Sequence, residues 1–284
     1  MKQKLLKYWL MTLISSLVLL SACGIRQLPD NLAASMLDNT DMILVEDALP
    51  AYLVMVDALI LTYPKNSGYL ATGAQLNSAY AGIFVADPER QQTISSKALD
   101  YARRASCLEV VSLCQIEQLS LDQQHEIMAS IHQERQAQWL HLLGSTWAGW
   151  IQAHSSDWNA VAQLGRVEAL LERQVQLAPG YNDAMGELYL AVLYSLLPPA
   201  LGGQPERAQQ MFETAIERSN GQNLIIKVFY AQQFARMMFD QELHDSLLER
   251  VLQAEVNQGN LTLQNSYAQR LAAELLAESS SYFF

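Results

Sequence analysis

His125 and His132 are the residues of this sequence that come nearest to a catalytic metal site. Zinc proteases hold their metal between two histidines four residues apart on one helix, with a glutamate directly after the first. Glu126 follows His125, but the second histidine lies seven residues on, which on a helix is about two turns and 10 Å. We therefore expect both histidines on a solvent-exposed helix face, and we predict no metal site.

Other arrangements that could support catalysis are missing from the sequence. The segment Leu143-Gly144-Ser145-Thr146-Trp147 lacks the glycine spacing of a nucleophile elbow. The chain has no glycine-rich phosphate loop and no dinucleotide-binding motif. We therefore predict that the protein is not an enzyme and binds no cofactor, with a hydrolase of unrecognised type as a remote alternative.

Cys107 and Cys114 are candidates for a disulfide. In an oxidising compartment a pair of cysteines is usually bonded. On a continuous helix seven residues span about 10.5 Å, which is more than the roughly 4.4–6.8 Å between the Cα atoms of bonded cysteines. We predict that the helix ends near Cys107 and that a turn brings Cys114 back to it. Two separate buried thiols are the alternative.

Cys23 is the expected site of a covalent lipid. Three lysines fall among the first seven residues, an apolar stretch runs from Tyr8 to Leu20, and Ser21-Ala22-Cys23-Gly24 follows. These features are typical of a secretion signal, and the run Leu20 to Cys23 resembles the lipobox of bacterial lipoproteins. We predict that residues 1–22 are a lipoprotein signal peptide and that Cys23 is acylated. An ordinary signal peptide with an incidental cysteine is the alternative.

The residues after the lipidation site predict where the protein lies. Residues 23–40 show little periodicity and are expected to form a lipidated N-terminal tether. Gly24 stands where many lipoproteins of the inner membrane carry aspartate. We therefore expect a chain anchored in the cell envelope, facing the periplasm, at the outer membrane.

The composition indicates a globular protein with a sizeable core. Half of the residues are hydrophobic and 17% are charged. Removal of the signal peptide takes away three lysines, which leaves 15 basic and 29 acidic residues and a net charge near −14. Because no cluster of basic residues stands out against this acidity, the sequence argues against nucleic-acid binding.

The spacing of apolar residues predicts helices almost throughout residues 41–284. Apolar residues recur at intervals of three and four, and strand-like alternation is rare. Asp87-Pro88 and Ser120-Leu121-Asp122-Gln123 are typical helix starts. Further helices are expected over 69–85, 180–194, 222–239, 240–254 and 261–278, and from Pro205 onward.

Paired helices with small residues at their crossings favour a tetratricopeptide-like array. Pro88-Glu89-Arg90 and Pro205-Glu206-Arg207 each open the second helix of a pair. These two starts lie 117 residues apart, which is not a multiple of the tetratricopeptide period of about 34 residues. The expected fold is therefore a divergent all-α solenoid of antiparallel helix pairs, with a plain helical bundle as the alternative.

A set of aromatic residues supplies the candidates for ligand binding. Aromatic side chains at helical spacing usually belong to the core, but they also line the cavities in which helical arrays hold apolar ligands. The sequence leaves both interpretations open. If a ligand site exists, we expect it near the loop at 198–204, with five candidate residues: Trp147, Trp150, Tyr189, Tyr194 and Tyr230.

An ordered series of short motifs resembles the T-component family associated with TRAP transporters (TatT). The series contains Trp147-Ala148-Gly149-Trp150, Val167 to Arg173 and Leu177-Ala178-Pro179-Gly180-Tyr181. It continues with Leu201-Gly202-Gly203, Pro205-Glu206-Arg207-Ala208 and Val228-Phe229-Tyr230-Ala231. The resemblance covers most of residues 45–284.

This resemblance implies a tetratricopeptide-like periplasmic lipoprotein that can form homo-oligomers. Members are thought to act beside the solute-binding protein of a TRAP transporter, with small hydrophobic molecules as proposed ligands. The resemblance therefore implies a transport accessory that docks a solute-binding protein and is held at the membrane by its lipid. The alternative is a helical-repeat scaffold lipoprotein that serves envelope protein assembly.

Overall fold

The computed structural model describes residues 35–196 and 203–284. These residues form helices and contain no strand, so the prediction of an all-α protein is confirmed. The predicted signal peptide and Cys23 lie outside the described residues. Among the helices that are described, none combines the length and the hydropathy needed to cross a membrane.

The helices follow one another along the chain with short connections. The first half contains α2 (Met42–Thr62), α3 (Ser67–Ile83), α4 (Pro88–Glu109), α5 (Leu121–Ser130) and α6 (Ala137–Ala153). The second half contains α7 (Trp158–Val161), α8 (Leu164–Leu177), α9 (Tyr181–Tyr194), α10 (Pro205–Arg218), α11 (Leu224–Phe229), α12 (Arg236–Met238), α13 (Gln241–Leu252) and α14 (Thr262–Tyr282). Short 3-10 turns η1 (Val111–Leu113), η2 (Ile116–Gln118), η3 (Glu134–Gln136) and η6 (Gly259–Leu261) join some of them.

The two helix starts that the sequence marks most clearly are confirmed. The Asp87 carboxylate accepts a hydrogen bond from the backbone N–H of Arg90 at 2.8 Å, with Pro88 in the first turn of α4. Ser120 and Gln123 exchange two hydrogen bonds, of 3.0 and 3.2 Å, in a capping box that begins α5. Side chains thus satisfy backbone donors that have no partner inside the helix.

The helix predicted over 222–239 is confirmed from Leu224 to Met238, but its hydrogen-bonding pattern changes along its length. It consists of α11, the π-helical segment η5 (Tyr230–Ala235) and α12. Phe239 then has a φ of 56°, in the left-handed region, and ends the helix. The π-helical turn inserts extra residues, which local periodicity does not reveal.

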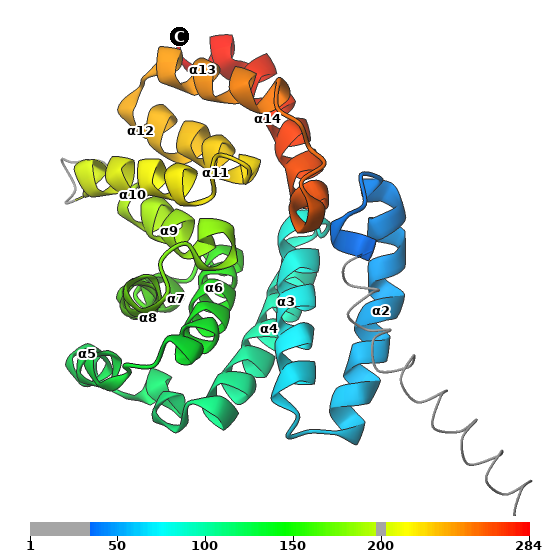
Figure 1. Cartoon of the computed structure of the whole chain (residues 1–284), viewed down its shortest axis with the longest axis vertical. Coiled ribbons are helices and arrows are strands. Elements are labelled where there is room, and N and C mark those ends of the chain that lie inside the picture. Colours follow the sequence, from blue (N-terminus) through cyan, green and yellow to red (C-terminus); the bar gives the residue numbers. More distant parts are fainter. Residues whose placement is uncertain (1–34, 197–202) are drawn as a thin grey trace, which may run out of the picture.

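Consecutive helices pack on one another along a curved path (Figure 1). The main core runs from α2 to α14, and its largest fully buried side chains include Trp147 and Phe212. The path returns on itself, because the start of α14 lies beside α2 and α3. The tetratricopeptide-like order of the helix pairs stays a prediction.

Cys107 and Cys114 form a disulfide in the structure. The helix extends two residues beyond Cys107, to Glu109, and η1 then turns the chain back. The Cα atoms of the two cysteines are 4.6 Å apart. The bond therefore closes a short loop directly after α4.

Candidate functional site

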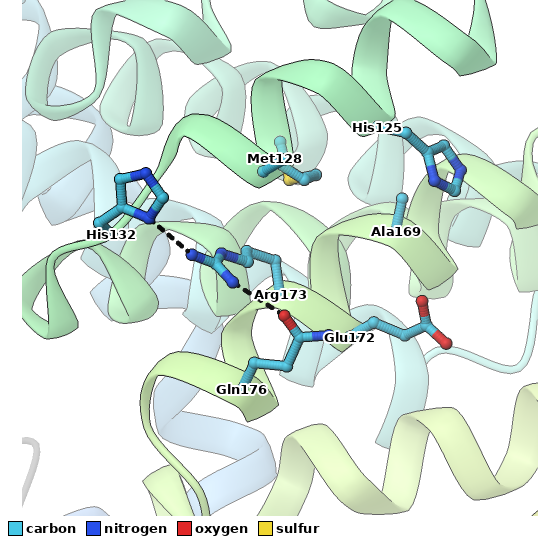
Figure 2. Close-up of a pocket in the computed structure, with 8 residues that line it drawn as sticks. His125, Met128, His132, Ala169, Glu172, Arg173 and Gln176 are labelled. Carbon is cyan, nitrogen blue, oxygen red and sulfur yellow. Dashed lines mark hydrogen bonds between the residues drawn. The ribbon is translucent and has the colours of Figure 1, made fainter.

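The candidate site is a groove that follows one face of α8. It consists of two adjoining concavities of about 440 and 170 Å³, which share Glu172 and Gln176. The first lies between α5 and α8 (Figure 2). The second lies between α8, α9 and α10. We call the two together the α8 groove.

The groove is formed because one face of α8 packs into the core, while α5 contacts the helix from the side. Val167, Leu170 and Leu171 of α8 are fully buried in the core. The Gln124 side chain of α5 donates a hydrogen bond of 2.7 Å to the carbonyl of Arg166. These contacts leave Ala169, Glu172, Arg173 and Gln176 lining the groove.

Arg173 joins the two walls of the first concavity. Its Nε donates to the carbonyl of Ile131 at 2.8 Å, just after the end of α5. The guanidinium also donates to Gln176 at 2.9 Å and to Nδ1 of His132 at 3.2 Å (Figure 2). Because arginine can only donate, His132 accepts at Nδ1 in this arrangement. Arg173 thereby sets the position of both polar walls.

Tyr194, Glu172 and Arg207 form a polar cluster in the second concavity. The Tyr194 hydroxyl donates to Glu172 at 2.9 Å and accepts from Arg207 at 2.7 Å. Arg207 also pairs with Glu172 at 2.8 Å, and its guanidinium lies 4.1 Å from the centre of the Tyr194 ring. Burial, together with the neighbouring Glu172, raises the pKa of Tyr194, so its hydroxyl keeps its proton.

Glu168 lies beside this cluster and interacts electrostatically with Glu172 and Arg207. Arg207 approaches Glu168 to 3.8 Å. Burial and repulsion by Glu172 raise the pKa of Glu168 above its ordinary value, while Arg207 opposes the rise. The second concavity combines one acid, Glu172, and one cation, Arg207, with apolar side chains of Val175, Leu190 and Met211, and Glu168 lies just outside this lining.

The structure brings only Tyr194 of the five candidate aromatics to the groove. Trp147 is 0% exposed and donates its indole N–H to Gln163 at 2.9 Å. Trp150 donates to Ser96 at 3.1 Å and stacks on His154. The other two pack elsewhere, Tyr189 against His141 and Tyr230 against Phe212.

Several residues that define the groove carry no functional signal in the sequence. Met128, Arg173 and Gln176 come from helices whose approach is not visible in local spacing. His125 and His132 are both exposed, as expected, and both line the same concavity. The expectation that both lie on a helix face is wrong for His132, because α5 ends at Ser130. Within the two described ranges, no three histidine, cysteine, aspartate or glutamate side chains are grouped to hold a metal ion.

The helices that build the groove all lie within one family match. The family described as TRAP transporter T-component matches residues 38–283, from shortly before α2 to the residue that follows α14. The chain belongs to this family. Membership confirms the resemblance seen in the sequence and associates the protein with a TRAP transport system. Among curated proteins, no match to this T-component is found.

Proposed function

We propose that this T-component is a non-catalytic accessory lipoprotein that docks the solute-binding protein of a TRAP transporter. The observation that supports the proposal is the extent of the family match, which includes every helix from α2 to α14. Acylated Cys23 anchors the protein at the outer membrane, and the helical array faces the periplasm. Of the predicted tether at 23–40, the residues before 35 separate the array from the membrane surface, because Met36 and Asp38 already contact the array.

We further propose that the α8 groove holds a small, rather hydrophobic ligand. Its floor is apolar where Met128, Ala129 and Ala169 line the first concavity. Polar side chains stand around this floor, with Arg173 and Glu172 among them. An apolar concavity with a few fixed polar groups is the usual form of a small-molecule site.

Capture from periplasmic extract tests the docking part. Tagged, mature protein should recover a TRAP solute-binding protein, and mass spectrometry of the complex should identify any small molecule that comes with it. Recovery of envelope-assembly proteins alone would instead support the scaffold function. A purified solute-binding protein encoded beside this gene that fails to bind even at high concentration would contradict docking.

A filled groove tests the ligand part. Ala129 is exposed and lines the groove, so Ala129→Trp should occupy the concavity without disturbing the core. We expect this variant to lose the co-purifying small molecule and keep its helical circular dichroism. Ala273→Trp, at an exposed position of α14, is the matched control and should keep the ligand. Equal ligand content in both variants would place the ligand outside the groove.

A further inference from the structure

The charged residues of α8 lie on opposite borders of the α8 groove. Arg166 and Arg173 are seven residues apart and share the side toward α5, to which both donate hydrogen bonds. Glu168 and Glu172 are four residues apart and share the side toward α10, where Arg207 approaches both. Spacings of four and seven residues keep side chains on one side of a helix. The groove therefore has a cationic border and an acidic border.

The cationic border has a positive charge that no acid neutralises. Arg173 donates to the carbonyl of Ile131, to the Gln176 side chain and to Nδ1 of His132, which are all uncharged acceptors. Arg166 likewise donates to a backbone carbonyl and to a side-chain amide. Among residues 35–196 and 203–284, the ion pairs include neither of these arginines.

Arg173 also keeps a hydrogen-bond donor free. A guanidinium has five N–H groups, and the bonds of Arg173 use Nε, both N–H groups of Nη2 and one N–H of Nη1. The other N–H of Nη1 has no acceptor in the part of the chain that the structure describes. Because a carboxylate forms charge-assisted hydrogen bonds with arginine, this border can bind the negative end of a ligand.

The acidic border has a free acceptor and an excess of negative charge. Tyr194 and Arg207 both donate to Oε1 of Glu172, at 2.9 and 2.8 Å, so Oε2 has no donor from the described residues. Two carboxylates share the single cation of Arg207. Burial and repulsion by Glu172 raise the pKa of Glu168. A second cation here would therefore be stabilised.

We propose that the ligand of the α8 groove is a small zwitterion, with a carboxylate at Arg173, an ammonium group at Glu172 and an apolar chain between them. The inference rests on the proposed ligand site in this groove. Figure 2 shows the Arg173 guanidinium and the Glu172 carboxylate at opposite ends of the first concavity. Met128, Ala129 and Ala169 supply the apolar surface for the chain.

The two free groups favour this class over an uncharged or singly charged ligand. An uncharged apolar molecule would remove water from both groups without replacing its hydrogen bonds, which costs free energy. An anion alone would bind Arg173 but would lie close to the excess negative charge of Glu168 and Glu172. A cation alone would bind Glu172 and leave Arg173 without a counter-ion.

Matched probes of one chain length test the proposal. Hexanoate, hexylamine, 6-aminohexanoate and 1-hexanol differ only in the groups at their ends. We expect 6-aminohexanoate to bind about tenfold or more tightly than the other three, because it alone forms both charge-assisted hydrogen bonds. Calorimetric titration of the lipidated protein in lipid nanodiscs measures this ratio. The four- and eight-carbon members of each series cover other distances between the two ends.

Two substitutions separate the roles of the borders. Arg173→Gln should weaken hexanoate and 6-aminohexanoate by about tenfold and leave hexylamine unchanged, while Arg173→Lys should retain most of the affinity. Glu172→Gln should weaken hexylamine and 6-aminohexanoate and leave hexanoate unchanged. Arg166→Gln is the matched control, because Arg166 also joins α8 to α5 but does not line the groove. A purely structural role of Arg173 would instead weaken all probes equally.

The outcomes distinguish this inference from the proposed function. If no aminocarboxylate of any length binds more tightly than its singly charged counterparts, the zwitterion is wrong. If 1-hexanol alone binds and Ala129→Trp abolishes its binding, the groove is a ligand site for uncharged molecules. If Ala129→Trp retains every probe, the groove itself is not the site. The molecule that co-purifies with the wild type should contain both an amine and a carboxyl group, and a ligand without either group would also overturn the inference.

Discussion

At the scale of single residues, His141 shows how burial in the core changes the pKa of an ionisable side chain. It lies buried on α6 beside the rings of Tyr181 and Tyr189. The Asn182 side-chain amide donates to its Nε2 at 3.2 Å, which requires the neutral ring. Burial lowers the pKa of His141 to about 4.

We expect His141 to make the protein less stable in acid. The pKa of His141 is about 4 in the folded state and near 6.5 in the unfolded state. Its contribution to the free energy of unfolding is therefore fully present above pH 6.5 and is lost as the pH is lowered toward 4. The loss amounts to about 3 kcal/mol. Urea unfolding of the wild type and His141→Gln across this range checks it. The variant should lack this part of the pH dependence, whereas His125→Gln at an exposed position should retain it.

Glu187 is a fully buried carboxylate that depends on one cation. It accepts a hydrogen bond from the backbone N–H of Gly180 at 2.8 Å and pairs with Arg218 of α10. We expect Arg218→Ala to destabilise the fold by about 3 kcal/mol, because it leaves a buried charge without its partner. Arg104→Ala removes an exposed pair with Asp100 and should cost under about 1 kcal/mol. Similar unfolding midpoints for the two variants would contradict this account.

At the scale of elements, we expect alanine substitutions at two glycines of α3 to have opposite effects on stability. A Cβ at Gly73 would lie 2.8 Å from side-chain atoms of Ile60 and Tyr101, so Gly73 allows α2 and α4 to approach α3. A Cβ at Gly82 would meet nothing within 4 Å. Gly73→Ala should therefore destabilise by about 1–3 kcal/mol, and Gly82→Ala should stabilise by about 1 kcal/mol. Thermal unfolding of both variants provides the check. A higher unfolding temperature in Gly73→Ala would show that Ile60 and Tyr101 can move to accept the added methyl group.

Local signals in the sequence predict a helix start where a nearby side chain caps the helix. Asp87 and Ser120 mark starts because their own side chains cap the helix. The start of α9 is different, because Asn182, Asp183 and Ala184 all have positive φ. The Asp183 carbonyl accepts a hydrogen bond of 2.9 Å from the Asn223 side chain, 40 residues away. Such a conformation depends on a distant partner, which spacing along the chain does not reveal.

The candidate site was hard to predict for the same reason. Trp147 and Tyr194 look alike as aromatic positions on helices, yet one is enclosed in the core and the other lines the groove. What separates them is the packing of α8 against α5, α6 and α9. Gln124 and Arg166, which join α5 to α8, are 42 residues apart. The aromatic pattern therefore identified candidate residues but not the surface on which a ligand could lie.

At the scale of the whole molecule, the two ends of the described chain are joined. The Thr262 hydroxyl at the start of α14 donates to Asp38 at 2.9 Å. Leu263 packs against the small core between α2 and α3. Repeat proteins in which each unit touches only its neighbours unfold unit by unit. A contact between residues 224 positions apart couples the first and last helices, so we expect unfolding in a single transition.

Asn265 provides the test of that coupling. Its side chain accepts from the backbone N–H of Leu224 at 3.0 Å and donates to the carbonyls of Gln222 and Val256. Asn265→Ala leaves these buried groups without partners and should cost about 2 kcal/mol or more. Because α14 also holds the N-terminal segment, hydrogen exchange should accelerate at α11 and equally at the start of α2. Faster exchange confined to α11 would show that the two ends of the array unfold independently.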